Sequence, residues 1–265
     1  MIKGQTILLI HGAGSIGKEW ENFQRAFETL GNKVIVPTLR FHELGQSTSP
    51  DLGQISILDY VEDIERIIVS LDQKPIIIGH SMGGLIALII CSRGVGKLGI
   101  FITPAAPSGI NAITPTVLRI FFRNILRWKF WTKPVPPNFS SAYYGVLHDL
   151  ERDHAKKVFE KSHSAESGRA LCEIGFPFFD TNSATKVNEQ AIECPTLIIG
   201  AGRDRITPTQ IARKLKRKLK SKADLIEFPH FSHYIMEGIE FEQVFEKCLN
   251  WMSEKINSKQ EKAKF

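Results

Sequence analysis

Residues 75–91 decide the fold, and they read Pro-Ile-Ile-Ile-Gly-His-Ser-Met-Gly-Gly-Leu-Ile-Ala-Leu-Ile-Ile-Cys. Residues 75–78 have the length and β-branching of a buried strand, and residues 84–91 suit a buried helix. Between them, residues 79–83 form a G-x-S-x-G motif around Ser81. A serine at such a strand-to-helix turn is held in a strained, exposed conformation with a helix N-terminus behind its hydroxyl. The pattern therefore predicts that Ser81 is a nucleophile.

The alternation of strand and helix extends over most of the chain. We predict strands at residues 6–10, 33–37, 76–79, 97–103, 196–200 and 224–228, and helices at residues 18–30, 57–71, 83–91, 208–219 and 239–256. Strands that alternate with helices form a parallel sheet covered on both faces. The predicted fold class is therefore α/β, with a mostly parallel sheet of about six strands.

Residues 111–182 break this alternation, because they contain no clear buried strand. They hold 12 of the 25 aromatic residues in 72 of the 265 positions. The prolines of 134–137 should stop any helix there. We interpret 111–182 as a helical lid inserted over the carboxyl edge of the sheet, where such a sheet places its ligands. Residues 1–110 and 183–256 then form the core, and residues 257–265 form a polar, frayed tail.

Composition and charge narrow the class of protein. A chain of 265 residues suits one large domain, and no apolar run is long enough to span a bilayer or to form a signal peptide. The four scattered cysteines fit buried thiols in a reducing compartment, so we expect a cytoplasmic protein. Much of the net charge of +6 lies in residues 213–220, which read as an amphipathic helix with a solvated basic face. We therefore predict no nucleic-acid partner and no integral membrane segment.

An acid and a base follow Ser81 in the order that nucleophilic catalysis requires. A serine hydroxyl needs a base that takes its proton, and the base needs a carboxylate that orients it. Asp204 follows the predicted strand 196–200, and His233 follows the predicted strand 224–228. Ser81, Asp204 and His233 are therefore the predicted catalytic residues.

Cleavage of an ester also places negative charge on the carbonyl oxygen, which two backbone N–H groups should stabilise. Met82, directly after the nucleophile, supplies one predicted donor. The other should come from the turn His11-Gly12-Ala13-Gly14 after the first strand. We predict that this donor is the N–H of Ala13, because the glycines on either side allow a tight turn.

The segments around the first turn, the Ser81 motif, Asp204 and His233 together resemble the α/β-hydrolase superfamily, in particular lidded serine esterases and lipases of the lysophospholipase and carboxylesterase type. The resemblance rests on 11–14, 79–84, 202–208 and 231–237, and it covers nearly the whole chain. It implies that Ser81 is the nucleophile, His233 the general base and Asp204 its orienting carboxylate. Ala13 and Met82 would form the oxyanion hole, and neither a cofactor nor a metal is implied. The sequence departs from the usual pattern of this superfamily in two ways. The two strands that many members have before the first predicted strand are missing, and Ser232 stands where members usually have glycine.

Rival residues exist for several of these roles. Asp180 is a rival acid, as are Asp59 and Asp63 on the predicted helix 57–71, where we expect them to be solvated. His230, three residues before His233, is the rival base. Residues 12–17 fit G-x-G-x-x-G, but the acidic residue that a dinucleotide site needs after the second strand is missing. Acidic residues and histidines in 148–154 lack a third strong metal ligand nearby.

The predicted function is hydrolysis of a carboxylic ester with an apolar acyl or alcohol part, through an acyl-enzyme. The partner is then a small hydrophobic ester. A C–C bond hydrolase, a thioesterase or an amidase could use the same three residues. A small-molecule binding protein that keeps the fold without turnover is the alternative of a different class. The sequence makes no prediction about oligomeric state.

Overall fold

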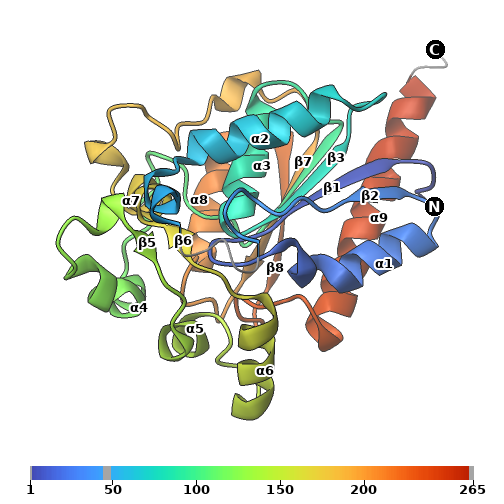
Figure 1. Cartoon of the computed structure of the whole chain (residues 1–265). Coiled ribbons are helices and arrows are strands. Elements are labelled where there is room, and N and C mark those ends of the chain that lie inside the picture. The colour runs from blue at the N-terminus through green and yellow to red at the C-terminus, as the bar shows by residue number, and fades with distance from the viewer. Residues whose placement is uncertain (1, 44–48, 263–265) are drawn as a thin grey trace.

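The structure, a computed structural model, describes residues 2–43 and 49–262. Its centre is a six-stranded sheet in the order β2-β1-β3-β4-β7-β8, and every neighbouring pair is parallel (Figure 1). The strands are β1 (Thr6–Ile10), β2 (Lys33–Ile35), β3 (Ile76–His80), β4 (Leu98–Ile102), β7 (Thr196–Ala201) and β8 (Ala223–Phe228). The predicted α/β fold and its six parallel strands are therefore confirmed.

Helices cover both faces of this sheet because successive strand residues point to opposite sides. Ile7 and Leu9 of β1 pack with α1 (Glu21–Thr29) and α9 (Gly238–Lys262). Leu8 and Ile10 pack with the helices of the other face, α2 (Ile57–Val69), α3 (Met82–Ser92) and α8 (Thr209–Leu219). Figure 1 shows the two groups of helices on either side of the strands. Helices shield both faces of the sheet from water, so the central strands consist of continuous apolar runs.

The order of the strands sets the position of the site. The chain runs from β1 outward to β2, and then returns to add β3 on the other side of β1. The loops that leave the carboxyl ends of β1 and β3 therefore run to opposite faces of the sheet. A crevice opens where two such loops diverge, and parallel sheets bind ligands there. The turns that carry Ala13 and Ser81 both lie at this place.

The segment 111–182 lies between β4 and β7 and is mostly helical. It contains α4 (Pro115–Ile125), α5 (Phe139–Gly145), α6 (Arg152–Ser162) and α7 (Gly168–Gly175). It also contains a short antiparallel pair, β5 (Pro134–Val135) with β6 (Glu166–Ser167). The sequence did not predict these strands, because two residues are too few to show a period of two.

Two helix ends differ from the predictions. The predicted helix 18–30 begins as a 3₁₀ turn at Gly17–Trp20 before α1 starts. The predicted end of the last helix at residue 256 is wrong, because α9 continues to Lys262 through residues predicted as a frayed tail. No glycine or proline interrupts 257–262, and most residues there favour a helix. The last three residues lie outside the described part of the chain.

Two further sequence observations can be compared with the structure. Cys91 on α3 and Cys248 on α9 are buried, as their places in apolar helical runs predict. Within residues 2–43 and 49–262, no helix is long and apolar enough to cross a membrane.

The helix α3 packs against β1 without any intervening side chain. A Cβ atom built at Gly83 would lie 2.1 Å from the carbonyl oxygen of Ile10. One built at Gly79 would lie 2.0 Å from the carbonyl oxygen of Gly83. Both glycines of the G-x-S-x-G motif are therefore required by the close approach of two backbones.

We expect Gly83→Ala to lower the free energy of unfolding by about 3 kcal/mol, the upper end for an overpacked core. Helix propensity alone would make alanine more stable than glycine by about 1 kcal/mol. A loss of stability in Gly83→Ala would therefore show that the clash of the new Cβ atom outweighs this gain. Urea denaturation of both proteins measures the difference. Gly175→Ala on α7 is the matched control, because its Cβ would meet only ordinary contacts and should not destabilise the protein. Equal behaviour of the two variants would contradict the close approach.

Candidate active site

Ser81 occupies a strained turn between β3 and α3. Its backbone has φ 54° and ψ −118°, a left-handed conformation that is uncommon for a residue with a side chain. Its N–H donates to the carbonyl of Ile102 at 3.0 Å, and its own carbonyl accepts from Ala105 at 2.9 Å. These bonds hold the turn against the end of β4. The predicted strain is present, but the side chain is not open to solvent, since the residue is only 8% exposed.

Asp204 and His233 meet as predicted, from loops that follow β7 and β8. Nδ1 of His233 lies 2.7 Å from Oδ2 of Asp204, and both side chains are almost completely buried. Because a carboxylate accepts, the proton of the neutral ring lies on Nδ1. Nε2 is then left with a lone pair, which is the form of histidine that can accept a proton from a hydroxyl.

Asp204 is held as a carboxylate by several donors. Oδ1 accepts from the N–H groups of Ile206 and Thr207, at 2.8 and 2.7 Å. The hydroxyl of Thr207 lies 2.8 Å from Oδ2. Burial by itself raises the pKa of Asp204, but the attraction of His233 and the donors of Thr207 outweigh burial and hold the pKa below its usual value. Thr207 was not singled out in the sequence, although it lies only three residues from Asp204.

Ser81 and His233 line one cavity, which brings the three predicted residues together. No hydrogen bond joins the Ser81 hydroxyl to His233 in this structure, which describes both residues. Such contacts are often long in the absence of substrate. The ring of His233 packs 4.7 Å from that of His80, whose Nε2 donates to the carbonyl of His233 at 3.0 Å. His80, next to Ser81, therefore positions the backbone of the predicted base.

The turn after β1 presents one backbone N–H between two that are already bonded. The N–H of Gly12 donates to Glu19 Oε1 at 3.0 Å, and that of Gly14 donates to Glu166 Oε2 at 2.9 Å. The N–H groups of Ala13 and Met82 have no acceptor among the described residues, and both residues line the cavity. Ala13 and Met82 are therefore available for the predicted oxyanion hole.

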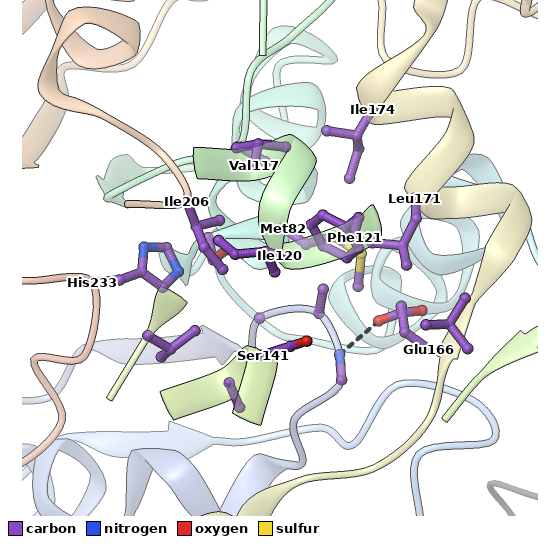
Figure 2. Close-up of a pocket in the computed structure, with 18 of the residues that line it drawn as sticks. Met82, Val117, Ile120, Phe121, Ser141, Glu166, Leu171, Ile174, Ile206 and His233 are labelled. Atoms are coloured by element: carbon purple, nitrogen blue, oxygen red, sulfur yellow. Dashed lines mark hydrogen bonds between the residues drawn. The ribbon is translucent and has the colours of Figure 1, made fainter. Parts of the chain in front are cut away.

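Glu166 is a functional candidate that sequence reasoning missed. It is 3% exposed, lines the cavity and comes from β6 of the inserted segment. Besides the N–H of Gly14, it accepts from the Tyr60 hydroxyl at 2.8 Å, from its neighbour's N–H at 2.6 Å and from Nε2 of His42 at 3.0 Å. Figure 2 shows Glu166 at the wall of the cavity beside the backbone nitrogen that it accepts from. Its 152-residue separation from Gly14 leaves no local signal in the sequence.

His42 carries the charge that balances Glu166. Its Nδ1 lies 3.0 Å from the carbonyl oxygen of Arg40, so Nδ1 must donate. Nε2 faces the carboxylate and must donate too, so both ring nitrogens are protonated. Burial lowers the pKa of His42, but Glu166 outweighs it and the pKa is raised. The pKa of Glu166 is lowered in turn, because His42 and the N–H donors outweigh its burial.

Glu19 is a second buried carboxylate at the same turn. Its Oε2 accepts from the hydroxyl of Ser15 at 2.6 Å, and its Oε1 lies 3.7 Å from Nδ1 of His80. Burial raises its pKa, but the nearby His80 ring and the hydroxyl of Ser15 outweigh burial and lower the pKa to about 2. Two carboxylates therefore fix the two N–H groups that flank Ala13.

Two other histidines near the turn are neutral. His11 accepts the N–H of Leu39 at Nε2, at 2.9 Å, and its Nδ1 donates to the carbonyl of Gly12. Burial lowers the pKa of His11 to about 4. Burial also lowers the pKa of His163 to about 4, and its ring packs 4.6 Å from Phe159. Both ring nitrogens of His11 therefore hold backbone groups beside the site.

The cavity has a volume of about 230 Å³ and mostly apolar walls. Figure 2 shows Val117, Ile120 and Phe121 of α4 on one side and Leu171 and Ile174 of α7 on another. Ser141 of α5 and Ile206, which lies beside His233, also line the cavity (Figure 2). The inserted segment thus forms most of the chamber over Ser81.

The rival residues have other roles. Asp180 accepts from the backbone N–H groups of Asn182 and Ala184, and among the described residues it has no hydrogen bond to a histidine. His230 is exposed at the turn after β8. Nε2 of His154 lies 2.5 Å from a Glu237 oxygen. Among the described residues, no group of three histidine, cysteine, aspartate or glutamate side chains could hold a metal ion.

Comparison with known proteins identifies the family and the fold of the chain. Residues 7–243 match the model of the Alpha/beta hydrolase family. The chain is 23% identical over 257 residues to a pyrethroid hydrolase of Sphingobium wenxiniae, covering 87% of this chain and 82% of that protein. Two solved structures share the fold at a TM-score of 0.68. They are a monoacylglycerol lipase of Paleococcus ferrophilus, 21% identical with 94% and 95% of the two chains covered, and a methylesterase from Arabidopsis, 14% identical with 94% and 99% covered.

We expect His163→Phe to make the protein less sensitive to acid. The pKa of His163 is lower in the folded chain than in the unfolded one, so the unfolded chain takes up the proton first. The stability of the wild type is therefore complete above about pH 6.5 and falls as the pH drops toward 4, by up to about 3 kcal/mol from this residue. Phenylalanine keeps the packing on Phe159 without the titration. Urea denaturation at several pH values measures this, and parallel pH curves for the two proteins would contradict it.

Proposed function

We propose that this chain, which belongs to the α/β hydrolase family, is a serine hydrolase that cleaves carboxylic esters with an apolar part through an acyl-enzyme. The observation that carries the proposal is the buried 2.7 Å pair of Asp204 and His233. His233 of this pair lines the same cavity as Ser81, which lies on its strained turn. The stability of the fold gives little reason to bring Ser81, Asp204 and His233 together, whereas nucleophilic catalysis requires all three.

The proposed reaction follows from the protonation of His233. Oγ of Ser81 attacks the ester carbonyl while Nε2 of His233 takes the hydroxyl proton. Asp204 keeps the other ring nitrogen protonated and stabilises the imidazolium that forms. The N–H groups of Ala13 and Met82 receive the oxyanion. His233 then returns the proton to the leaving alcohol, and a water molecule activated by the same base frees the acid from Ser81.

The apolar walls of the cavity support a substrate with a hydrophobic acyl or alcohol part. The names of the similar proteins, a pyrethroid hydrolase and a monoacylglycerol lipase among them, point the same way. We also propose that residues 111–182 act as a lid over a core of 1–110 and 183–256. The reaction as written uses no cofactor, and the sequence favours a cytoplasmic location.

Other bonds fit the same three residues. A thioester, an amide or a C–C bond next to a carbonyl could be attacked in the same way, so these reactions are alternatives within one mechanism. A binding protein without turnover would keep the cavity but would have no use for an ordered Asp204–His233 pair. A reactive Ser81 separates the two classes.

We expect Ser81→Ala to reduce kcat for p-nitrophenyl butyrate by about 10⁴- to 10⁶-fold, because the nucleophile is lost while the cavity stays intact. Ser141→Ala, which removes another hydroxyl from the same cavity, is the matched control and should change kcat by less than about tenfold. Similar losses in both variants would contradict the assignment of the nucleophile. No hydrolysis of any p-nitrophenyl ester from acetate to palmitate, together with no labelling of Ser81 by a fluorophosphonate, would favour the binding protein.

We expect Glu166→Gln to reduce kcat by about ten- to a hundredfold with little change in KM, less than the loss of a whole oxyanion donor. The amide turns an N–H donor toward the N–H of Gly14 or toward His42, so the turn that carries Ala13 must shift. The apolar walls that bind the substrate are unaffected.

Glu173→Gln is the control for this effect. Glu173 is also buried in the inserted segment, but it accepts from the Ser56 hydroxyl and the Ile57 N–H, away from the oxyanion turn. We expect both variants to lose stability and only Glu166→Gln to lose kcat. An equal loss of kcat in both variants would mean that Glu166 acts through folding alone.

A further inference from the structure

The helix α4 has two apolar faces, and only one of them is covered. Val117, Ile120 and Phe121 point into the cavity (Figure 2). On the outer side, Leu118 and Phe122 lie four residues apart, and Leu126 continues the row directly after the helix. They are 43%, 58% and 69% exposed. Residues at this spacing form a single stripe along a helix, so α4 presents a continuous apolar stripe to solvent.

A row of cations runs beside this stripe. Arg119, Arg123 and Arg127 each follow one of the three apolar residues, and Lys129 and Lys133 come next in the chain. No aspartate or glutamate occurs anywhere in residues 111–148. Trp128, in the turn after α4, is 77% exposed, and Trp131 is also exposed. We call residues 115–133 the α4 surface, and it combines exposed aromatic residues, an apolar stripe and positive charge.

We propose that the α4 surface docks on an anionic phospholipid bilayer. An amphipathic helix with arginines on its polar side and leucine, phenylalanine and tryptophan on its apolar side binds in the plane of a membrane interface. Tryptophan prefers the depth of the headgroups, and each cation adds attraction to anionic lipids. In Figure 1, α4 lies at the outer edge of the molecule, on the left, whereas α9 lies on the right. Leu118, Phe122 and Leu126 are exposed, so no other described element covers the apolar stripe.

The charge of the α4 surface disfavours a second copy of the chain as its occupant. A two-fold contact would bring the same cations of both copies together. An anionic bilayer offers the opposite charge and an apolar interior at the same time.

A comparison within the molecule supports the same choice. The helix α8 is more basic than α4, but its apolar residues Ile211, Leu215 and Leu219 are buried in the core. It therefore has charge without an uncovered apolar stripe. The combination that fits a bilayer is found on α4 and not on α8.

Docking would connect the membrane to the cavity through one helix. Leu118 both lines the cavity and reaches solvent, so the cavity wall extends to the α4 surface. If the proposed ester hydrolysis holds, esters with a long acyl chain could pass from the bilayer to Ser81 along this helix. The docking itself does not depend on that activity.

The test is co-sedimentation of the full chain with vesicles of phosphatidylcholine alone and of equal parts phosphatidylcholine and phosphatidylglycerol. We expect stronger binding to the anionic vesicles and a loss of that difference at high salt. The side chains of Arg123 and Lys129 form no ion pair or hydrogen bond with the described residues, so they can be changed without disturbing the fold. Replacing both with glutamine should weaken binding to anionic vesicles about twenty-five-fold, at about fivefold for each charge. Phe122→Ser with Trp128→Ser should weaken binding to both kinds of vesicle by about tenfold or more.

Matched controls come from other surfaces. Lys214→Gln with Arg217→Gln removes the same charge from α8, and Val69→Ser removes an exposed apolar residue from α2. Both should leave vesicle binding unchanged, and circular dichroism should show that every variant is folded. The proposal is overturned if the wild type does not bind anionic vesicles, or if the α8 variant loses as much binding as the α4 variant. It is also overturned if sedimentation velocity finds a dimer that Phe122→Ser dissociates while vesicles are not bound. Because binding is read without turnover, a failed ester assay and a failed docking assay are separate results.

Discussion

The close approach of α3 to β1, with Gly83 against the carbonyl of Ile10, is the constraint on which the site depends. It lets the helix start directly behind Ser81 and brings the turn after β3 beside the turn after β1. The N–H groups of Ala13 and Met82, which we propose as the oxyanion donors, then come from two turns that a side chain at Gly83 would have pushed apart. The strain at Ser81 persists because strands and helices on both sides of the turn are already packed.

Buried charge is the second organising feature, and it is concentrated at the carboxyl edge of the sheet. Glu19, Glu166 and Asp204 are all shielded from water, which is costly for a carboxylate without partners. Each accepts from N–H or O–H donors, and each has a histidine ring beside it. Removing one partner of such a group typically destabilises a protein by about 3–5 kcal/mol. The edge is therefore rigid where the reaction is proposed to occur, although the walls above it are apolar and adaptable.

The parts of the fold that could be predicted are those that short, local sequence patterns determine. The strand before Ser81, the helix after it and the places of Asp204 and His233 after their strands all follow from short apolar runs and the order of residues between them. The contact of Asp204 with His233 could be expected only because parallel strands end at one edge. The partners of Glu166 could not be predicted, because Tyr60, His42 and Gly14 lie in separate segments more than a hundred residues away in the sequence. The pairing of β5 with β6 was missed for a related reason, because two-residue strands carry no periodic signal.

Glu166 gives the inserted segment an unexpected relation to the rest of the chain. A segment between two strands is usually regarded as a module that can be exchanged between relatives while the core keeps its chemistry. Here the module contributes the acceptor for a backbone N–H next to Ala13, so part of the support of the core turn belongs to the insertion. A chimaera that took residues 111–182 from a relative would retain Ser81, Asp204 and His233 and still lack that support, unless the graft placed a carboxylate at the same point. Divergence of the insertion is thus limited at β6 and less restricted along the outer side of α4, where Leu118, Phe122 and Leu126 are exposed.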